Sequence, residues 1–191
     1  DASHAHAVTL VGNATRGYDA NGNITTLGGQ KLTYDAENRL MQVTSGGNTL
    51  AMYAYNGDGA RVKQVAGSDA TYYVGNWFEV KNGVATKYYY FGAQRVAMQN
   101  ASGITYLHSD HLGSTSVTSG AQSSTQTYYA YGAVRTTSGT LPTDYTFTGQ
   151  KNDASDAVLF YNARHYATAL GRFVQPDSII PNPGNPQSLN R

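Results

Sequence analysis

The sequence has no cysteine, little charge and no long apolar run, and each absence excludes a class of protein. Without cysteine there is no disulfide framework, no thiolate metal site and no cysteine nucleophile. Only 13% of the 191 residues are charged and the formal net charge is +1, so nucleic-acid binding through a basic surface is not expected. No apolar stretch reaches the roughly 18 residues of a membrane-spanning helix. Residues 1–10 lack the basic and apolar regions of a signal peptide, so none is expected within the chain.

Glycine and tyrosine are abundant, with 21 and 16 copies, whereas Trp77 is the single tryptophan. Tyrosine and threonine favour strands, and Asn-Gly and Asp-Gly pairs supply the positive φ angles of tight hairpin turns. Such pairs occur at 21–22, 56–57, 58–59 and 82–83. The alternation of strand-forming runs and turn signals predicts an all-β chain of successive hairpins.

One pattern recurs along the first part of the chain. It reads Tyr-Asp-Ala-Asn-Gly-Asn at 18–23, Tyr-Asp-Ala-Glu-Asn-Arg-Leu at 34–40 and Tyr-Ala-Tyr-Asn-Gly-Asp-Gly at 53–59. Repeats of this length indicate stacked supersecondary units. The segment 152–170 lies in the longest stretch without glycine or proline. A helix is conceivable there, but side chains alternate over 159–166, which favours a strand at its end.

These units resemble the tyrosine-aspartate (YD) repeats of Rhs proteins, Tc toxin C components, wall-associated bacterial toxins and teneurins. Four further motifs are similar to the Rhs-associated core, in the same order. They are Tyr-Leu-His-Ser-Asp-His-Leu-Gly-Ser-Thr at 106–115, Tyr-Thr-Phe-Thr-Gly-Gln-Lys at 145–151, Leu-Phe-Tyr-Asn-Ala-Arg-His-Tyr at 159–166 and Leu-Gly-Arg-Phe-Val-Gln-Pro-Asp at 170–177.

The resemblance implies a β-ribbon that spirals into a hollow shell around a C-terminal toxin, with the core acting as a plug. It divides the chain into YD repeats of the shell wall (1–104) and an Rhs core segment (105–191) that is truncated before the autocleavage site. The implied partners are the protein's own C-terminal toxin or neighbouring YD repeats. The implied location is secreted or on a bacterial cell surface.

The resemblance also implies an aspartyl autoprotease in the full-length parent, with Asp177 as the first catalytic aspartate and Arg164 as its arginine. Such a protease needs two carboxylates that share one proton, and an adjacent arginine would keep its aspartate ionised. The second aspartate and the cleaved bond are expected after Arg191, so the chain itself is not expected to be an enzyme. A structural reading stays open, in which Asp177 ends a turn and pairs with Arg164.

Other candidate sites have weaker patterns. His108, Asp110 and His111 would not converge on one ion if they lay along a strand, because His111 would face the opposite side. We therefore expect the aspartate and histidines to bond backbone groups at a turn ending in 112–114. His4 and His6 are read as surface residues. No metal or cofactor is expected.

The tyrosine clusters allow two interpretations. Exposed rings near Trp77 and at 88–90 could stack on sugars, but a periodicity through the whole chain favours rings that pack on the next hairpin and bond through their hydroxyls. An alternative function is also open: an adhesive or filament-forming surface protein without cargo, in which identical copies stack strand to strand and cover their exposed edges.

Overall fold

The computed structural model describes residues 7–12, 14–153, 158–177, 182 and 184–185. Within these residues the chain forms nineteen strands and a single 3-10 turn, so the predicted all-β fold is confirmed. No helix among them is long and apolar enough to cross a membrane.

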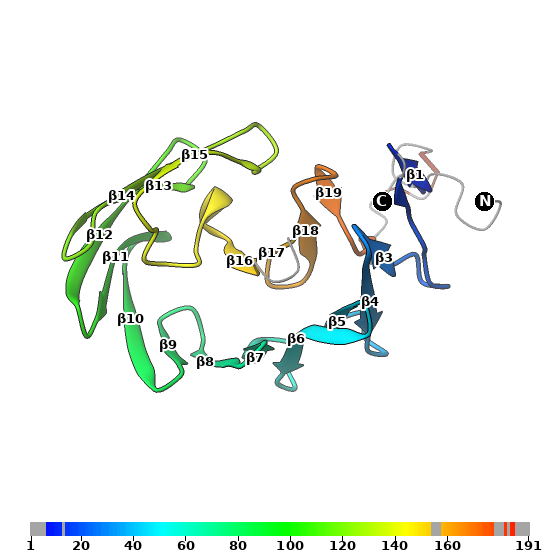
Figure 1. Cartoon of the computed structure of the whole chain (residues 1–191), viewed down its shortest axis with the longest axis horizontal. Coiled ribbons are helices and arrows are strands. Elements are labelled where there is room, and N and C mark those ends of the chain that lie inside the picture. Colours follow the sequence, from blue (N-terminus) through cyan, green and yellow to red (C-terminus); the bar gives the residue numbers. More distant parts are fainter. Residues whose placement is uncertain (1–6, 13, 154–157, 178–181, 183, 186–191) are drawn as a thin grey trace.

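The strands form three antiparallel sheets (Figure 1). A small sheet pairs β1 (Leu10–Val11) with β2 (Ala14–Thr15). The large sheet joins thirteen strands in sequence order. They are β3 (Thr26–Leu27), β4 (Gln30–Tyr34), β5 (Leu40–Ser45), β6 (Asn48–Tyr55), β7 (Arg61–Ala66), β8 (Asp69–Val74), β9 (Phe78–Lys81), β10 (Val84–Phe91), β11 (Gln94–Asn100), β12 (Gly103–Ser109), β13 (Thr115–Gly120), β14 (Ser124–Tyr128) and β15 (Val134–Ser138).

A third sheet of four short strands lies inside the curve of the large one (Figure 1). Its strands are β16 (Lys151–Asp153), β17 (Val158–Phe160), β18 (His165–Ala167) and β19 (Arg172–Phe173), and the 3-10 turn η1 (Phe147–Gly149) precedes it. We call these four strands the inner sheet. The expectation for 152–170 was only partly correct. A strand does occur near its end, but the alternation over 159–166 is interrupted by a turn at Asn162, whose φ is 62°.

The tyrosine-aspartate pattern encodes a five-residue turn. An Asp or Asn side chain accepts hydrogen bonds through Oδ1 from the backbone N–H groups two and four residues later, and the residue between those two has a positive φ angle. Four turns share this geometry, and they begin at Asp19, Asp35, Asn56 and Asp110. The local side-chain bond replaces the missing ladder bonds at the end of each strand pair.

Short turns alternate with these long ones. Two-residue turns at 28–29, 46–47 and 82–83 have positive φ at both positions, which is why glycine or asparagine stands there. Since consecutive turns of a meander lie at opposite edges, all long turns line one edge of the large sheet. Neighbouring long turns touch there: Asn38 Oδ1 accepts bonds from the Nδ2 atoms of Asn21 at 2.8 Å and Asn23 at 2.9 Å.

Many tyrosine hydroxyls bond a carbonyl in an earlier repeat. Tyr55 donates to the Leu40 carbonyl at 2.8 Å, and Tyr128 donates to that of Thr115 at 2.9 Å. The predicted packing is thus confirmed for tyrosines such as Tyr55 and Tyr128. Four exposed tyrosines do not fit it: Tyr72, Tyr106, Tyr129 and Tyr131. A fifth, Tyr89, is exposed, yet its hydroxyl donates to Gln99 Oε1 of the next strand at 2.7 Å.

The main core forms where the inner sheet meets the first strands of the large sheet. Leu32, Leu40 and Val43 of the large sheet are buried with Val158 and Ala167 of the inner sheet. The inner sheet also connects both ends of the arc. At one end the Ile24 N–H donates to the Val174 carbonyl at 2.8 Å; at the other the Tyr166 hydroxyl donates to the Tyr131 carbonyl at 3.3 Å.

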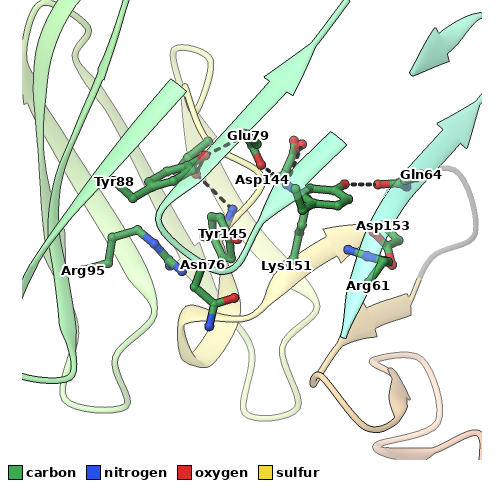
Figure 2. Close-up of polar contacts among 12 residues, drawn as sticks. Arg61, Gln64, Asn76, Glu79, Tyr88, Arg95, Asp144, Tyr145, Lys151 and Asp153 are labelled. Carbon is green, nitrogen blue, oxygen red and sulfur yellow. Dashed lines mark hydrogen bonds and ion pairs between the residues drawn. The ribbon is translucent and has the colours of Figure 1, made fainter. Parts of the chain in front are cut away.

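A buried ion pair joins the two sheets. Arg61 of β7 donates from Nη1 to Asp153 Oδ2 of β16 at 2.6 Å, and the two side chains are 2% and 0% exposed (Figure 2). The guanidinium also lies 4.0 Å from the centroid of the Phe160 ring. Burial lowers the pKa of Arg61, but the Asp153 charge and hydrogen bond outweigh it, so the pKa is raised and Arg61 stays charged.

His165 lies against the same pair and is neutral. Its ring Nδ1 is 3.4 Å from Gln175 Nε2, and its Nε2 is 3.7 Å from Asp153 Oδ2. Complete burial, together with the nearby Arg61 charge, lowers its pKa well below the usual 6.5. The Nε2 contact therefore is not an ion pair, and we assign the ring proton to Nε2 because the Gln175 amide donates to Nδ1.

We predict that the long turns depend on their acceptor side chain. Asp35→Ala removes the acceptor of the Glu37 and Arg39 N–H groups. It should lower the free energy of unfolding by about 1–2 kcal/mol in chemical denaturation. Asp58→Ala is the matched control, because the Asp58 carboxylate forms no hydrogen bond or ion pair within the described residues. Equal effects of the two changes would contradict a structural role for the acceptor.

Breaking the Arg61–Asp153 pair should be far more costly than breaking an exposed pair. Arg61→Met leaves a buried carboxylate without its counter-ion and should lower the free energy of unfolding by about 3–5 kcal/mol. The double variant Arg61→Met/Asp153→Leu should recover most of that loss. Lys81→Met, which removes the exposed Lys81–Asp69 contact, should cost less than about 1 kcal/mol. A double variant no more stable than Arg61→Met would refute the assignment.

Stability should fall as the pH drops below about 6.5, the ordinary pKa of an unfolded histidine. In the folded state the pKa of His165 is lower, so only the unfolded state takes up this proton, and acid favours unfolding. Between pH 7.5 and 5.5 the wild-type protein should lose stability, and His165→Gln should show a smaller loss. His108→Gln, at an exposed position, serves as the control. Identical pH profiles for all three proteins would show that His165 does not titrate as described.

Candidate functional site on the concave side

A cavity of about 610 Å³ opens along the edge of the large sheet that carries the long turns. Its walls come from the turns at 75–76, 93–94 and 110–113, and from residues 145 and 148–151 on the opposite side. Three cations line it: Arg61, Arg95 and Lys151. Polar groups of the large sheet and of the segment that leads into the inner sheet thus line the same cavity.

Lys151 contacts one acid of the large sheet and one acid of the chain that leads into the inner sheet. Its Nζ lies 2.9 Å from Glu79 Oε2 of β9 and 3.6 Å from Asp144 Oδ2 (Figure 2). The Tyr88 hydroxyl donates to the other Glu79 oxygen at 3.0 Å. Burial lowers the pKa of Lys151, but the Glu79 charge outweighs that effect, so the pKa is raised and the ammonium stays protonated.

Arg95 is the half-buried cation of this cavity and is surrounded by tyrosine rings. Its Cζ lies 3.3 Å from the Tyr145 ring centroid and 5.2 Å from those of Tyr88 and Tyr90. Nη1 donates to the Gly149 carbonyl at 3.3 Å. Burial raises the pKa of Tyr145, although Lys151 and Arg95 act in the opposite direction, so this ring stays neutral beside the guanidinium.

The two residues predicted as a catalytic pair do lie together. Arg164 Nη2 is 3.4 Å from Asp177 Oδ2, and the side chains are 29% and 48% exposed. The Arg164 guanidinium also lies 4.0 Å from the Phe173 ring centroid, which fixes its position at the end of β19. Pro176, just before Asp177, faces Gly22 of the first long turn. The predicted pairing is confirmed, whereas a catalytic role stays a prediction.

The histidine cluster does not form a metal site. Asp110 begins a long turn, and its Oδ1 accepts bonds from the Leu112 and Ser114 N–H groups, as the turn interpretation predicted. His108 differs from that prediction, because its Nε2 contacts the Ser119 hydroxyl at 2.9 Å, not a backbone group. No three His, Asp or Glu side chains gather within the described part of the chain. His4 and His6 lie outside the described residues.

Sequence reasoning missed the buried cations, although a signal was present. Leu40 lies opposite Tyr34 across the β4–β5 pair, and Arg61 lies opposite Tyr55 across the β6–β7 pair. The spacing in the sequence is the same in both cases, so Arg61 occupies the position that Leu40 has in the preceding repeat. A charged residue at a position that is apolar in the preceding repeat indicates a buried partner. The identity of that partner, Asp153, had no comparable signal.

Comparisons with known proteins agree with this architecture. Residues 11–50 match the family model of the RHS Repeat. The chain is 27% identical over 195 aligned residues to the tRNA3(Ser)-specific nuclease WapA of Bacillus spizizenii, which covers 93% of this chain and 8% of WapA.

Solved structures of Tc toxins share the fold. A crystal structure of TcdB2-TccC3 matches with a TM-score of 0.71 at 22% identity, over 84% of this chain and 10% of that one. A Tc holotoxin pore of Photorhabdus luminescens, with a mutation in TccC3, matches with a TM-score of 0.72 at 21% identity, over 91% and 10%. The chain therefore spans about a tenth of the length of these relatives.

The repeated turn, the continuous antiparallel ribbon and the matches in sequence and structure point to one family. The YD pattern has a physical basis in the four turns that start with Asp or Asn, and the RHS Repeat model covers the first two of them completely. Together these findings support an Rhs/YD-repeat family for this chain, with the direct match of a family model at residues 11–50.

Proposed function

We propose that this chain forms part of the wall and the plug of a shell that encloses a C-terminal toxin and later releases it. The observation that carries this proposal is the inner sheet, which lies on the concave side of the thirteen-stranded ribbon (Figure 1). A ribbon that already packs later parts of its own chain inside its curve has the geometry needed to hold still later parts there.

The proposal divides the chain into a shell-wall part, residues 1–104, and an Rhs core part, residues 105–191. Residues 1–104 would supply wall alone. Residues 105–191 would supply most of β12 and the strands β13 to β15 of the wall, and would then turn inward to form the plug from β16 onward. The partners would be the protein's own toxin segment and neighbouring YD repeats, in a secreted or surface protein of a bacterium. WapA, a much longer relative, is named as a nuclease, which is consistent with a toxic cargo.

Arg164 and Asp177 would contribute to release in the full-length parent. We propose that Asp177 is one of two carboxylates of an aspartyl autoprotease and that Arg164 holds its negative charge in place. The contact at 3.4 Å supports this pairing, and the packing of Arg164 on Phe173 fixes its orientation. A chain held inside a shell meets its protease at a fixed geometry, which replaces a diffusive encounter.

The alternative of an adhesive or filament-forming protein has less support. Identical copies could pair through the open edges of the large sheet at β3 and β15, but a filament gives no reason for an inner sheet on the concave side. The residues that follow Arg191 in the parent distinguish the two. A second aspartate followed by a further domain indicates a shell, and a wall anchor indicates an adhesin.

We predict that a parent extended past Arg191 through its next Asp-Pro motif cleaves itself. On a denaturing gel it should appear as two polypeptides, and both Asp177→Asn and Arg164→Ala should appear as one, because the dyad needs an ionised aspartate. Asp58→Asn is the control at an exposed turn position and should still give two bands. If Asp177→Asn is cleaved like the wild type, Asp177 has only a structural role.

A further inference from the structure

The cavity on the concave side contains a cation without an acidic partner. Arg61 is paired with Asp153 and Lys151 with Glu79, whereas Arg95 forms no ion pair with any described residue. Among the described residues its one hydrogen bond runs from Nη1 to the Gly149 carbonyl, so the rest of the guanidinium edge, including the buried Nε, has no acceptor in this part of the chain. Arg95 therefore supplies an unsatisfied positive charge at a space large enough for a ligand.

The position of Arg95 is fixed before any ligand arrives. Tyr145 lies against its guanidinium plane at 3.3 Å from Cζ to the ring centroid, and Tyr88 and Tyr90 flank it. A planar guanidinium held in this way loses little conformational freedom on binding, and its fork of N–H donors matches the two oxygens of a carboxylate.

The surrounding charges favour a monoanion. Asp110 lines the cavity, and Glu79 and Asp153 lie behind its cationic wall as partners of Lys151 and Arg61. With Asp144, the second acid beside Lys151, these acids balance the three cations of the lining, so a phosphate, with about −1.5 to −2 charges, would meet more repulsion than a carboxylate with one. Aromatic rings complete the lining, with Tyr73, Tyr90, Tyr145 and Phe160.

We propose that this cavity binds a carboxylate joined to an aromatic or apolar body, with Arg95 as the residue that recognises the charge. The carboxylate comes either from an acidic side chain of a polypeptide or from a free organic acid. Neither case requires that the chain enclose a toxin, so the inference is independent of the proposed function.

Trp77 provides an internal reporter of binding. It is the only tryptophan in the sequence, and its ring centroid lies 4.9 Å from that of Tyr90, which lines the cavity. Titration with benzoate at constant ionic strength should give a saturable change in tryptophan fluorescence, with a Kd of roughly 1 mM for a ligand of this size. Benzamide, its uncharged counterpart, and inorganic phosphate should each bind at least about tenfold more weakly. Line broadening of 4-fluorobenzoate in fluorine NMR checks the result independently of Trp77.

Variants test the role of Arg95 directly. Arg95→Gln should weaken benzoate binding at least about tenfold, and Arg95→Lys, which keeps the charge but loses the planar fork, should give an intermediate value. Arg135→Gln on the exposed strand β15 is the matched control and should bind like the wild type. Circular dichroism establishes that each variant is folded, and Arg95→Lys replaces Arg95→Gln if the latter is not.

Peptides distinguish the two sources of the carboxylate. An acidic polypeptide is indicated if acetyl-Glu-Tyr-amide binds more tightly than both benzoate and acetyl-Gln-Tyr-amide. A free organic acid is indicated if acetyl-Glu-Tyr-amide binds more weakly than benzoate. The proposal is overturned if no carboxylate gives a saturable response by either method. It is equally overturned if benzamide or phosphate binds as well as benzoate, or if the folded Arg95 variant binds benzoate like the wild type.

Discussion

The inner sheet is joined to the large sheet by buried opposite charges, above all by the ion pair between Arg61 and Asp153. These residues are separated by 92 positions in the sequence, and each would be a costly buried charge without the other. The pair fixes where β16 crosses the concave face. The short strands that follow bring the neutral His165 and the apolar Val158 into the buried interface and place Arg164 beside Asp177.

The ribbon itself is held by a different and local principle. Each long turn is closed by an Asp or Asn side chain that bonds its own backbone. At three of the four turns the preceding residue is a tyrosine, Tyr18, Tyr34 or Tyr55, whose hydroxyl donates to a carbonyl earlier in the chain. These bonds join residues that are close in the sequence. The large sheet therefore consists of small units that repeat the same geometry. The inner sheet, in contrast, is specified by contacts between distant parts of the chain.

This difference explains what could be predicted from the sequence. The β-hairpin character and the turns at Asp19 and Asp35 follow from local patterns, and the pairing of Arg164 with Asp177 followed from a resemblance between motifs. The inner sheet was not predicted from periodicity, because strands of three residues are too short for an alternation to be visible. The partner of Arg61 and the cavity around Arg95 depend on how distant segments meet, which no local pattern encodes.

The order of the strands has a consequence for how the chain acquires its structure. In the large sheet every strand pairs with its neighbours in sequence, so each hairpin closes a short loop and can form soon after its residues are synthesised. The inner sheet also pairs its strands in sequence order, but its docking onto the large sheet must close much longer loops, and its strands follow those of the large sheet. During synthesis, at roughly 5–20 residues per second, the wall can thus assemble while its concave side is still empty, and the segment that fills this side arrives afterwards. The order of the strands in the sequence thereby sets an order of folding, in which the curved large sheet forms before the inner sheet packs against it.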